Sequence, residues 1–310
     1  MVRTVVIGAI NWDVNLFVKA FPRPGEETVV EHVTRVPGGK AGNVAVAAAR
    51  LLGPNQVAIL GGLGKDSIGS EQVRIFEKEG VATSGLKFAE DVESGQAYII
   101  INEEGENVIH SYRGANKALA PNDLDDAKRR ELVSKSTVVT ILDPPFETAL
   151  KLARNAKQLN KIVVWDPGAW STLGLEKVRE LLEELDYLIP NESEIENLTG
   201  TTNYNEGAGK LIDTNPTLKV VAKLGARGCV MYDAKGRTVS EALDLKSRGL
   251  KVLNTVGCGD AFLGAFVAAL CEGRPDVEAL RWGNYAGGLK ATRAETRGSP
   301  DRETLLRLLA

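Results

Sequence analysis

Cysteine and histidine are scarce in this sequence, and their scarcity excludes several classes of protein. The 310 residues include three cysteines, Cys229, Cys258 and Cys271, and two histidines, His32 and His110. Cysteines so widely separated form neither a disulfide framework nor a zinc-binding pattern. The two histidines belong to no motif, and we assign them to the surface or to structural roles. We therefore expect neither a disulfide framework nor a structural metal.

Long apolar runs and an excess of positive charge are also missing. No run approaches the about 18 apolar residues that cross a membrane, and residues 1–8 enter a strand-like run at once, without the features of a signal peptide. The 38 Lys and Arg residues are balanced by 41 Asp and Glu residues, a net charge of -3, whereas dedicated nucleic-acid binders are normally basic. The sequence therefore predicts a soluble cytoplasmic protein that binds neither nucleic acid nor a membrane.

Short β-branched runs alternate with helical patterns over most of the chain. Strands are expected at 5–8, 57–61, 138–142, 162–165, 187–189 and 220–224. Helices are expected between them at 42–52, 67–79, 146–159, 175–184 and 192–198, and then at 260–272, 276–293 and 301–309. This alternation predicts a doubly wound α/β fold, in which helices cover both faces of a parallel sheet.

Two segments, 14–36 and 95–113, break this alternation. Apolar and polar residues alternate in them and turn signals interrupt them, as is typical of hairpins. They either extend an edge of the sheet or form a β lid over a site at the carboxyl ends of the strands. We expect the lid, formed by residues 14–36 and 95–113, with residues 1–13, 37–94 and 114–310 forming the α/β core.

The segment Asn254-Thr-Val-Gly-Cys-Gly-Asp260 carries the strongest chemical signal. Gly257, Cys258 and Gly259 precede an expected helix, where backbone N–H groups at the positive end form a cradle for phosphate oxygens. Asp260 either caps this helix or accepts a proton from a substrate hydroxyl as a phosphoryl group arrives. Because a cap does not need three small residues before it, the segment favours phosphoryl transfer.

A second segment, Gly39-Lys-Ala-Gly-Asn43, lets backbone approach a ligand, or is simply a tight turn before a closely packed helix. Asn11 and Asp13, which follow the first strand, add an amide and a carboxylate suited to the vicinal hydroxyls of a sugar.

Two further segments follow strands in the second half of the chain. In Pro190-Asn-Glu-Ser-Glu194, Asn191 and Glu194 either cap a helix or hold Mg²⁺, directly or through water. The segment from Lys223 to Gly228 is either a hairpin turn or a wall of a nucleotide site. Residues 61–65 do not form a P-loop, and residues 8–11 are not a dinucleotide fingerprint.

Taken in this order, the segments resemble the ribokinase (PfkB-type) family of sugar kinases. The segment from Gly39 resembles the first signature of the family, and the segment from Asn254 resembles the second. Similarity extends to residues 21–26, 64–69, 105–108, 114–119, 190–194 and 224–228. The resemblance implies a ribokinase-like fold and Mg²⁺-dependent transfer of the terminal phosphoryl group of a nucleotide, ATP or else ADP, to a hydroxyl of a ribose-like sugar.

The resemblance also implies roles for individual residues. Asp260 is the expected base, with the amides of Gly257, Cys258 and Gly259 as the anion hole. The sugar site is expected to comprise Asn11, Asp13, Gly39, Lys40, Asn43 and Asp143, where ribokinases carry Glu in place of Asp143. Asn191 is expected at the nucleotide phosphates and Glu194 at Mg²⁺ through water. The residues expected to border the adenosine are Lys223, Gly225, Ala226, Gly228 and Asn284. Family lids often form the dimer contact, so we expect a homodimer.

Departures from the family pattern carry information too. Asn254 replaces the usual Asp and Glu295 the usual Gly, both in the monovalent-cation site of ribokinases, so we do not expect activation by potassium. Cys258 replaces a small Ala and is either a tolerated change of volume or a reactive thiol at a helix N-terminus.

Arg113 ends the second lid segment, where ribokinases usually lack Arg. Relatives that act on anionic substrates carry an Arg near this point, and a guanidinium can bind a carboxylate or phosphate with two hydrogen bonds; otherwise Arg113 is a solvated lid residue. The alternatives for the acceptor are a nucleoside, 2-keto-3-deoxygluconate, or a sugar phosphate such as ribose 1-phosphate. The alternative from a different functional class is that the chain is a non-catalytic nucleotide- or sugar-binding regulator.

Overall fold

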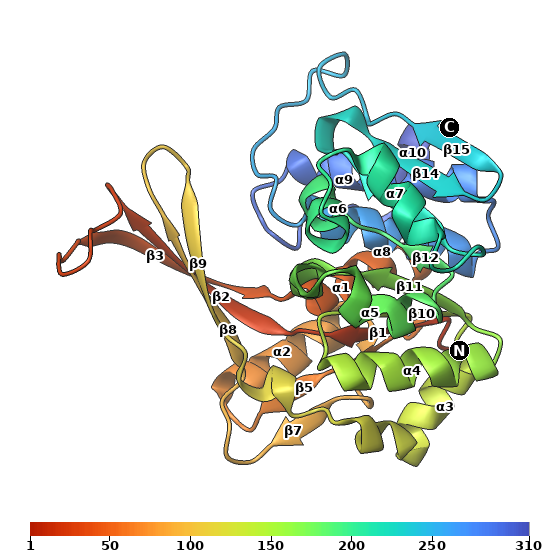
Figure 1. The fold of residues 1–310 in the computed structure, drawn as a ribbon. Coiled ribbons are helices and arrows are strands. Elements are labelled where there is room, and N and C mark those ends of the chain that lie inside the picture. Colours follow the sequence, from red (N-terminus) through yellow and green to blue (C-terminus); the bar gives the residue numbers. More distant parts are fainter. Residues whose placement is uncertain (310) are drawn as a thin grey trace.

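The computed structural model describes residues 1–309, which form a large α/β body with a smaller sheet projecting from it (Figure 1). The body is built on a nine-stranded sheet with the strand order β15-β14-β13-β12-β11-β10-β1-β4-β6. Its strands are β1 (Thr4–Gly8), β4 (Val57–Leu60), β6 (Val81–Ala82), β10 (Val138–Leu142), β11 (Ile162–Asp166), β12 (Tyr187–Leu188), β13 (Lys219–Lys223), β14 (Cys229–Asp233) and β15 (Gly236–Ser240). The strands from β13 to β6 are parallel, and β14 and β15 continue the sheet antiparallel at one edge.

The chain builds this sheet in both directions from β1. It adds β4 and β6 on one side, and later β10, β11, β12 and β13 on the other. In open α/β sheets, ligands bind beyond the carboxyl ends of the strands at such a switch point, because the loops of the two halves diverge there. The topology therefore places a candidate site above the ends of β1 and β10.

Helices cover both faces of the sheet, as alternating side chains along the strands require. Val6 packs into the core on one face, whereas Val5 and Ile7 pack into the core on the other. The first face carries α1 (Lys40–Leu52), α2 (Ser67–Lys78), α8 (Cys258–Cys271), α9 (Asp276–Ala291) and α10 (Arg302–Leu309). The second carries α3 (Ala127–Lys135), α4 (Phe146–Gln158), α5 (Leu175–Leu182), α6 (Glu192–Thr199) and α7 (Tyr204–Ile212). None of the helices described within residues 1–309 is long and apolar enough to cross a membrane.

Helix α8 is buried from Ala261 to Cys271 and packs closely against α1. Small residues allow this approach: a Cβ atom at Gly264 would lie 2.5 Å from the Cβ of Ala47. Both helices begin at the same edge of the molecule, so the N-terminus of α8 lies beside the first turn of α1. The two glycine-rich segments, far apart in sequence, are thereby brought together.

The projecting sheet has the strand order β3-β2-β8-β9 (Figure 1). Its strands are β2 (Asn11–Val18), β3 (Val30–Gly38), β8 (Gly95–Ile101) and β9 (Asn107–Tyr112). β2 pairs antiparallel with β3 and parallel with β8, and β8 pairs antiparallel with β9. Because side chains alternate along a strand, Asn11 and Asp13 lie on the same face of this sheet. A separate pair, β5 (Gly62–Gly64) and β7 (Lys87–Ala89), completes the strands.

The structure differs from the sequence-based expectation in a few elements. The expected parallel sheet is mixed, because β14 and β15 were not recognised and run antiparallel. Helices α3 and α7 were missed: α3 buries only Val133 among its residues, and α7 contains Gly207 and Gly209. Helix α8 begins at Cys258, two residues before Asp260. Short 3-10 helices span Gly114–Lys117, Pro121–Asp125, Gly168–Leu173 and Gly225–Arg227.

Candidate active site

Four polar side chains stand at the carboxyl ends of successive parallel strands. Asp143 follows β10, Asp166 ends β11, Asn191 follows β12 and Lys223 ends β13. The carboxyl ends of parallel strands meet at one edge of the sheet, which brings together residues up to 80 positions apart in this set. The N-termini of α1 and α8 approach the same edge, and they add Lys40, Asn43 and Asp260.

Asp260 lies in the first turn of α8 and faces the first turn of α1. The side-chain amide of Asn43 donates from Nδ2 to Oδ2 of Asp260 at 2.8 Å. Burial raises the pKa of Asp260, while the positive charge of Lys40 and the hydrogen bond from Asn43 oppose that rise. A carboxylate whose pKa is raised and whose second oxygen is not bound by Asn43 is suited to accept a proton.

The sequence analysis did not single out Arg297, which lies behind Asn43. Its Nε donates to Oδ1 of Asn43 at 2.9 Å, and its Nη2 donates to the carbonyl oxygen of Gly38 at 2.8 Å. The side chain is buried, with 8% of the residue exposed. In the sequence, Arg297 is an isolated Arg after helix α9 that belongs to no motif, so no sequence signal could have identified it.

Asp13 and Asn11 extend from β2 toward this group. The Asp13 carboxylate is buried, and burial raises its pKa to about 6 against the opposing charge of Arg297. Any side chain at Gly38 would collide with it, since a Cβ there would lie 2.1 Å from Oδ2 of Asp13. Oδ1 of Asn11 accepts a hydrogen bond from Nδ2 of Asn116 at 2.8 Å. The amide of Asn11 is thus fixed in one orientation.

Asp166 is the centre of a charged cluster that the sequence analysis also missed. Its Oδ1 lies 2.5 Å from Nζ of Lys40, and its Oδ2 lies 2.5 Å from Nζ of Lys223. Burial opposes ionisation, yet the two ammonium groups hold the pKa of Asp166 well below its ordinary value. Burial alone would lower the pKa of Lys40. The negative charges of Asp166 and of Glu194, whose Oε1 lies 3.4 Å from Nζ of Lys40, outweigh burial and raise that pKa. Lys40 is therefore charged at neutral pH.

Asn191 and Glu194 form a capping box at the start of α6. Oδ1 of Asn191 accepts from the backbone N–H of Glu194, and Oε2 of Glu194 accepts from the backbone N–H of Asn191, both at 2.8 Å. Among residues 1–309, three or more metal-ligating side chains nowhere gather into one site. A single carboxylate beside a phosphate site fits Mg²⁺, which keeps much of its hydration and is held largely by substrate phosphates. Glu194, the residue expected at Mg²⁺ through water, has its Oε1 3.4 Å from Nζ of Lys40.

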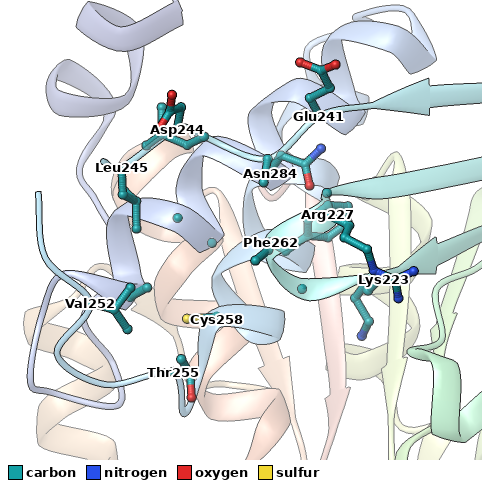
Figure 2. A pocket seen from close by; sticks show the side chains of 18 of the residues that line it. Lys223, Arg227, Glu241, Asp244, Leu245, Val252, Thr255, Cys258, Phe262 and Asn284 are labelled. Atoms are coloured by element: carbon teal, nitrogen blue, oxygen red, sulfur yellow. The ribbon is translucent and has the colours of Figure 1, made fainter. Parts of the chain in front are cut away.

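A cavity of about 820 Å³ opens between the β13–β14 turn, the segment 241–255, and helices α8 and α9 (Figure 2). It is lined by five residues expected to border a nucleotide: Lys223, Gly225, Ala226, Gly228 and Asn284. Cys258 and Gly259, at the N-terminus of α8, line its inner end. Asn191 does not line the cavity, but it pairs with Lys223 through a β-bridge. The segment from Lys223 to Gly228 is both a turn between antiparallel strands and a cavity wall.

The N-terminus of α8 leaves backbone amides available to an anion. The backbone N–H groups of Gly257 and Gly259 have no backbone acceptor among residues 1–309, whereas that of Cys258 donates to the carbonyl oxygen of Thr255 at 3.2 Å. Gly257 adopts φ 85°, and a Cβ there would lie 2.4 Å from the carbonyl oxygen of Thr296. Burial raises the pKa of the Cys258 thiol, which favours the interpretation of Cys258 as a tolerated change of volume.

The loops that contain Asn254 and Glu295 are joined by a lysine. Lys290 is fully buried in α9, and its Nζ donates to the carbonyl oxygens of Asn254, at 2.9 Å, and Arg293, at 3.3 Å. The side chain of Asn254 donates to the carbonyl oxygen of Ala294 at 2.7 Å. An ammonium group thus sits on backbone carbonyls between these two loops.

Arg113 lies beside Asp143, on the lid side of the site. Its guanidinium is 5.0 Å from the centre of the Trp170 ring. Asp143 adopts a left-handed backbone conformation, φ 55°, and its Oδ1 accepts from the N–H of Ala169 at 3.1 Å. Burial raises the pKa of Asp143 to about 6, against the positive charges of Lys40 and Arg113. Arg113 therefore packs on an aromatic ring, and its charge acts on a carboxylate of the candidate site.

An α/β fold with a carboxylate at a helix N-terminus, beside a cluster of buried polar side chains and next to a large cavity, is typical of one class, the carbohydrate kinases of ribokinase-like fold. These are phosphotransferases that act on a sugar hydroxyl. The chain belongs to the pfkB family of carbohydrate kinases, whose family model matches residues 1–303. The resemblance noted from the sequence and the expected fold class are thus confirmed.

Individual relatives cover nearly the whole chain. A ribokinase of Haemophilus influenzae is 31% identical over 309 residues, covering 98% of this chain and 97% of its own length. An ATP-dependent ribose-1-phosphate kinase of Halopiger xanaduensis is 29% identical over 313 residues, covering 100% and 99%. The structure of Arabidopsis thaliana ribokinase complexed with ribose and ATP matches with a TM-score of 0.89 at 26% identity, covering 100% of this chain and 99% of that one.

Proposed function

We propose that this chain is a Mg²⁺-dependent kinase that transfers the terminal phosphoryl group of ATP to a hydroxyl of a ribose-like sugar, with Asp260 as the base. The observation that carries the proposal is the position of Asp260. Asp260 accepts a hydrogen bond from Asn43, which belongs to the cluster of polar side chains. The residue before it, Gly259, lines the nucleotide-sized cavity. The relative in complex with ribose and ATP supports both ligand classes.

On the acceptor side, the groups around Asp260 suit a polyhydroxylated substrate. The Asp13 carboxylate accepts no hydrogen bond from the described residues 1–309, and Asn11 and Asn43 present amides of fixed orientation near it. Lys40 and Asp143 lie close enough to influence each other electrostatically. A sugar bound here would place one hydroxyl at the free oxygen of Asp260.

On the donor side, the cavity would hold the nucleoside, and its inner end would hold the phosphates. The free N–H groups of Gly257 and Gly259 face that end at the positive pole of α8. Lys223 lies nearby, since a Cβ at Gly259 would be 3.8 Å from its Nζ. Mg²⁺, when bound beside Glu194, supplies charge neutralisation to the phosphates.

The chemical step follows from this arrangement. Asp260 takes the proton of the acceptor hydroxyl as its oxygen forms a bond to the terminal phosphorus, while the bond from phosphorus to the bridging oxygen of the nucleotide breaks. Lys40, Lys223 and the α8 amides stabilise the negative charge on the transferring group. Positioning and charge stabilisation account for catalysis of this type, because the protein forms no covalent bond itself.

The projecting sheet is, in this proposal, a lid that excludes water from the sugar pocket. Its division from the core at residues 14–36 and 95–113 remains a prediction. Large apolar side chains of β8 and β9 are exposed, among them Tyr98, Val108, Ile109 and Tyr112. An exposed apolar sheet of this kind supports the predicted homodimer through the lid. The molar mass in solution, measured by light scattering, tests it.

A second candidate acceptor is anionic, a sugar phosphate such as ribose 1-phosphate. Arg113 beside the site favours it, and so does the relative named as a ribose-1-phosphate kinase. Same-family kinases for a nucleoside or 2-keto-3-deoxygluconate remain alternatives. A non-catalytic regulator is disfavoured, because such a protein does not need a base beside the anion cradle.

The test is acceptor-dependent nucleotide turnover with Mg²⁺, with ATP and ADP as separate donors. The acceptor panel contains ribose, ribose 1-phosphate, ribose 5-phosphate, 2-keto-3-deoxygluconate and nucleosides, and Asp260→Asn is run beside the native chain. Turnover on one acceptor that disappears in Asp260→Asn is expected. Turnover that survives in Asp260→Asn would remove Asp260 as the base, and nucleotide binding without turnover on any acceptor would favour the regulator.

A further inference from the structure

Arg297 is a buried cation that the chemical step above does not use. It lies in the segment after α9, with its guanidinium 5.2 Å from the centre of the Phe76 ring. Gly42 makes room for it, since a Cβ at that position would lie 2.4 Å from Nη2. The first signature segment is therefore shaped to accept this side chain from the other end of the sequence, 254 residues away from Asn43.

The hydrogen bonds of Arg297 end on the sugar side of the site. Nε donates to Oδ1 of Asn43 at 2.9 Å, and Nη2 donates to the carbonyl oxygen of Gly38 at 2.8 Å and to Oε1 of Gln72 at 3.3 Å. A guanidinium is planar, so two donors that are both engaged fix the whole group. Arg297 thus holds a rigid position relative to Asn43.

The amide of Asn43 is fixed as a consequence. A guanidinium can only donate hydrogen bonds and an ionised carboxylate can only accept them. An amide between the two must turn its oxygen to Arg297 and its nitrogen to Asp260, as observed. The reverse orientation would place two donors together on one side and two acceptors together on the other.

We infer that Arg297 is a positioning residue for the base: it orients the amide of Asn43 so that Nδ2 binds one oxygen of Asp260 and leaves the other oxygen for the acceptor hydroxyl. This inference rests on the proposed function of Asp260. The Asp260 carboxylate cannot rotate about its Cβ–Cγ bond without losing the hydrogen bond from Asn43. Arg297 acts through Asn43 and does not touch the substrate in this account.

A simpler role would be to hold the C-terminal segment in place, and Arg50 offers a matched control for it. Nη1 of Arg50 donates to the carbonyl oxygens of Arg297, at 2.7 Å, and Ser299, at 2.9 Å. Arg50 therefore anchors the same segment without contacting Asn43. Arg50→Met loosens the segment, whereas Arg297→Met removes the bond to the amide.

The kinetic test measures kcat and KM for Arg297→Met and Arg50→Met, each in the native and the Asn43→Ala background of the full chain. If Arg297 acts through Asn43, Arg297→Met lowers kcat by about 10- to 100-fold in the native background, as a slight misplacement of reacting groups does. It causes no further loss in the Asn43→Ala background, because the residue through which it acts is already gone. Arg297→Gln, which keeps one N–H donor, recovers part of the loss. Equal losses in both backgrounds, or an equal loss in Arg50→Met, would overturn the inference.

A second measurement does not depend on turnover. The side-chain amide protons of Asn43 are observed by NMR of chains labelled at Asn with ¹⁵N, and their signal is assigned by its loss in Asn43→Ala. We expect a proton shifted downfield by its hydrogen bond to Asp260 in the native chain and in Arg50→Met, with the shift lost in Arg297→Met. An unchanged signal in Arg297→Met would refute the inference even if the chain had no kinase activity, while the absence of activity alone would refute the proposed function.

Discussion

The carboxylate of Asp166 lies 2.5 Å from the ammonium group of Lys40, at a position where only 1% of the Asp166 residue is exposed. Its other oxygen is equally close to Lys223. One buried carboxylate thus fixes two cations, one on the α1 side of Asp260 and one at the nucleotide cavity. The two ammonium groups share the negative charge of Asp166, and Glu194 adds a second negative charge 3.4 Å from Lys40, so the charges of the four groups balance while both cations are held in place.

We expect Asp166→Asn to destabilise the protein and to abolish activity. Removing one partner from a buried ionic cluster leaves uncompensated charge and costs about 3–5 kcal/mol of the free energy of unfolding. The measurement is urea unfolding at pH 7. As a control, Glu180→Gln breaks the exposed ion pair with Arg154 and should change the free energy by less than about 1 kcal/mol.

The pH dependence of this effect has a defined sign. The pKa of Asp166 is lower in the folded protein than its ordinary value of 3.8, so its contribution to stability is present above about pH 4 and is lost as the pH falls below that. The difference between the native chain and Asp166→Asn should therefore shrink in acid. A difference that stays constant from pH 7 to pH 3 would contradict the account.

Asp13 should show the opposite pH dependence. Burial raises its pKa to about 6 from 3.8, so between these values the folded state binds a proton that the unfolded state does not. Its contribution to stability accordingly declines as the pH rises from about 4 to about 6. Asp13→Asn lacks this decline, so the variant should gain stability relative to the native chain across that interval.

Thermal unfolding of the native chain and Asp13→Asn at several pH values between 4 and 7 measures this. Asp143→Asn is a companion variant, because burial also raises the pKa of Asp143 to about 6. Stability curves of the native chain and Asp13→Asn that run parallel over the interval would show that the buried carboxyl is not perturbed.

Much of the fold could be predicted from the sequence because its signals are local. The run Val138–Leu142 is apolar, β-branched and bounded by polar residues, and the strand has those bounds. The edge strand β15 was missed because it alternates weakly and is largely exposed, whereas β14, its buried neighbour, was missed although its run Cys229–Asp233 is mostly apolar. The start of α8 was misplaced by two residues, since Gly257 and Gly259 read as a turn although the first helical turn already includes Cys258 and Gly259.

The candidate site was predictable only where residues form a motif. Asp260, Asn43 and Asn191 stand in such segments, but Asp166 looks like the end of an ordinary strand, 126 residues from Lys40. Arg297 and Lys290 were also not predicted, because neither stands in a motif. Each is an isolated basic residue that a sequence pattern assigns to solvent, and only the packing of distant segments buries it.

Lys290 leads to a prediction about monovalent cations. Its ammonium group donates to the carbonyl oxygens of Asn254 and Arg293 in the two loops beside Gly257. We expect the activity of the native chain to be unchanged when potassium is replaced by tetramethylammonium. We expect Lys290→Met to lower kcat by at least about 10-fold, since two hydrogen bonds from a charged donor, each worth about 1.5–3 kcal/mol, are lost.

The control is Arg281→Met, which removes an exposed cation from the same helix and should leave kcat unchanged. Addition of ammonium chloride to Lys290→Ala, where the side chain leaves space, should restore part of the activity. Strong activation of the native chain by potassium would contradict the prediction, because it would require a second cation beside the one that Lys290 supplies.

Arg113 distinguishes a neutral from an anionic acceptor. The guanidinium lies over the Trp170 ring, and its positive charge acts on the Asp143 carboxylate, so Arg113 is close to the site. If the acceptor carries a phosphate or carboxylate, Arg113→Ala should raise its KM by about 10- to 150-fold, the equivalent of a hydrogen bond to a charged group of about 1.5–3 kcal/mol. Arg113→Lys should recover less than half of that in free energy, because it keeps the charge but loses the paired donors.

The measurement is a comparison of KM for ribose and for ribose 1-phosphate in the native chain, Arg113→Ala, Arg113→Lys and Trp170→Leu. Trp170→Leu removes the ring that supports the guanidinium, and it should raise the KM of the anionic acceptor less than Arg113→Ala does. The KM for ribose should not change in any variant, since a neutral sugar offers no charge to Arg113. If the KM of the best acceptor is the same in Arg113→Ala as in the native chain, the anionic acceptor is ruled out and Arg113 serves the lid instead.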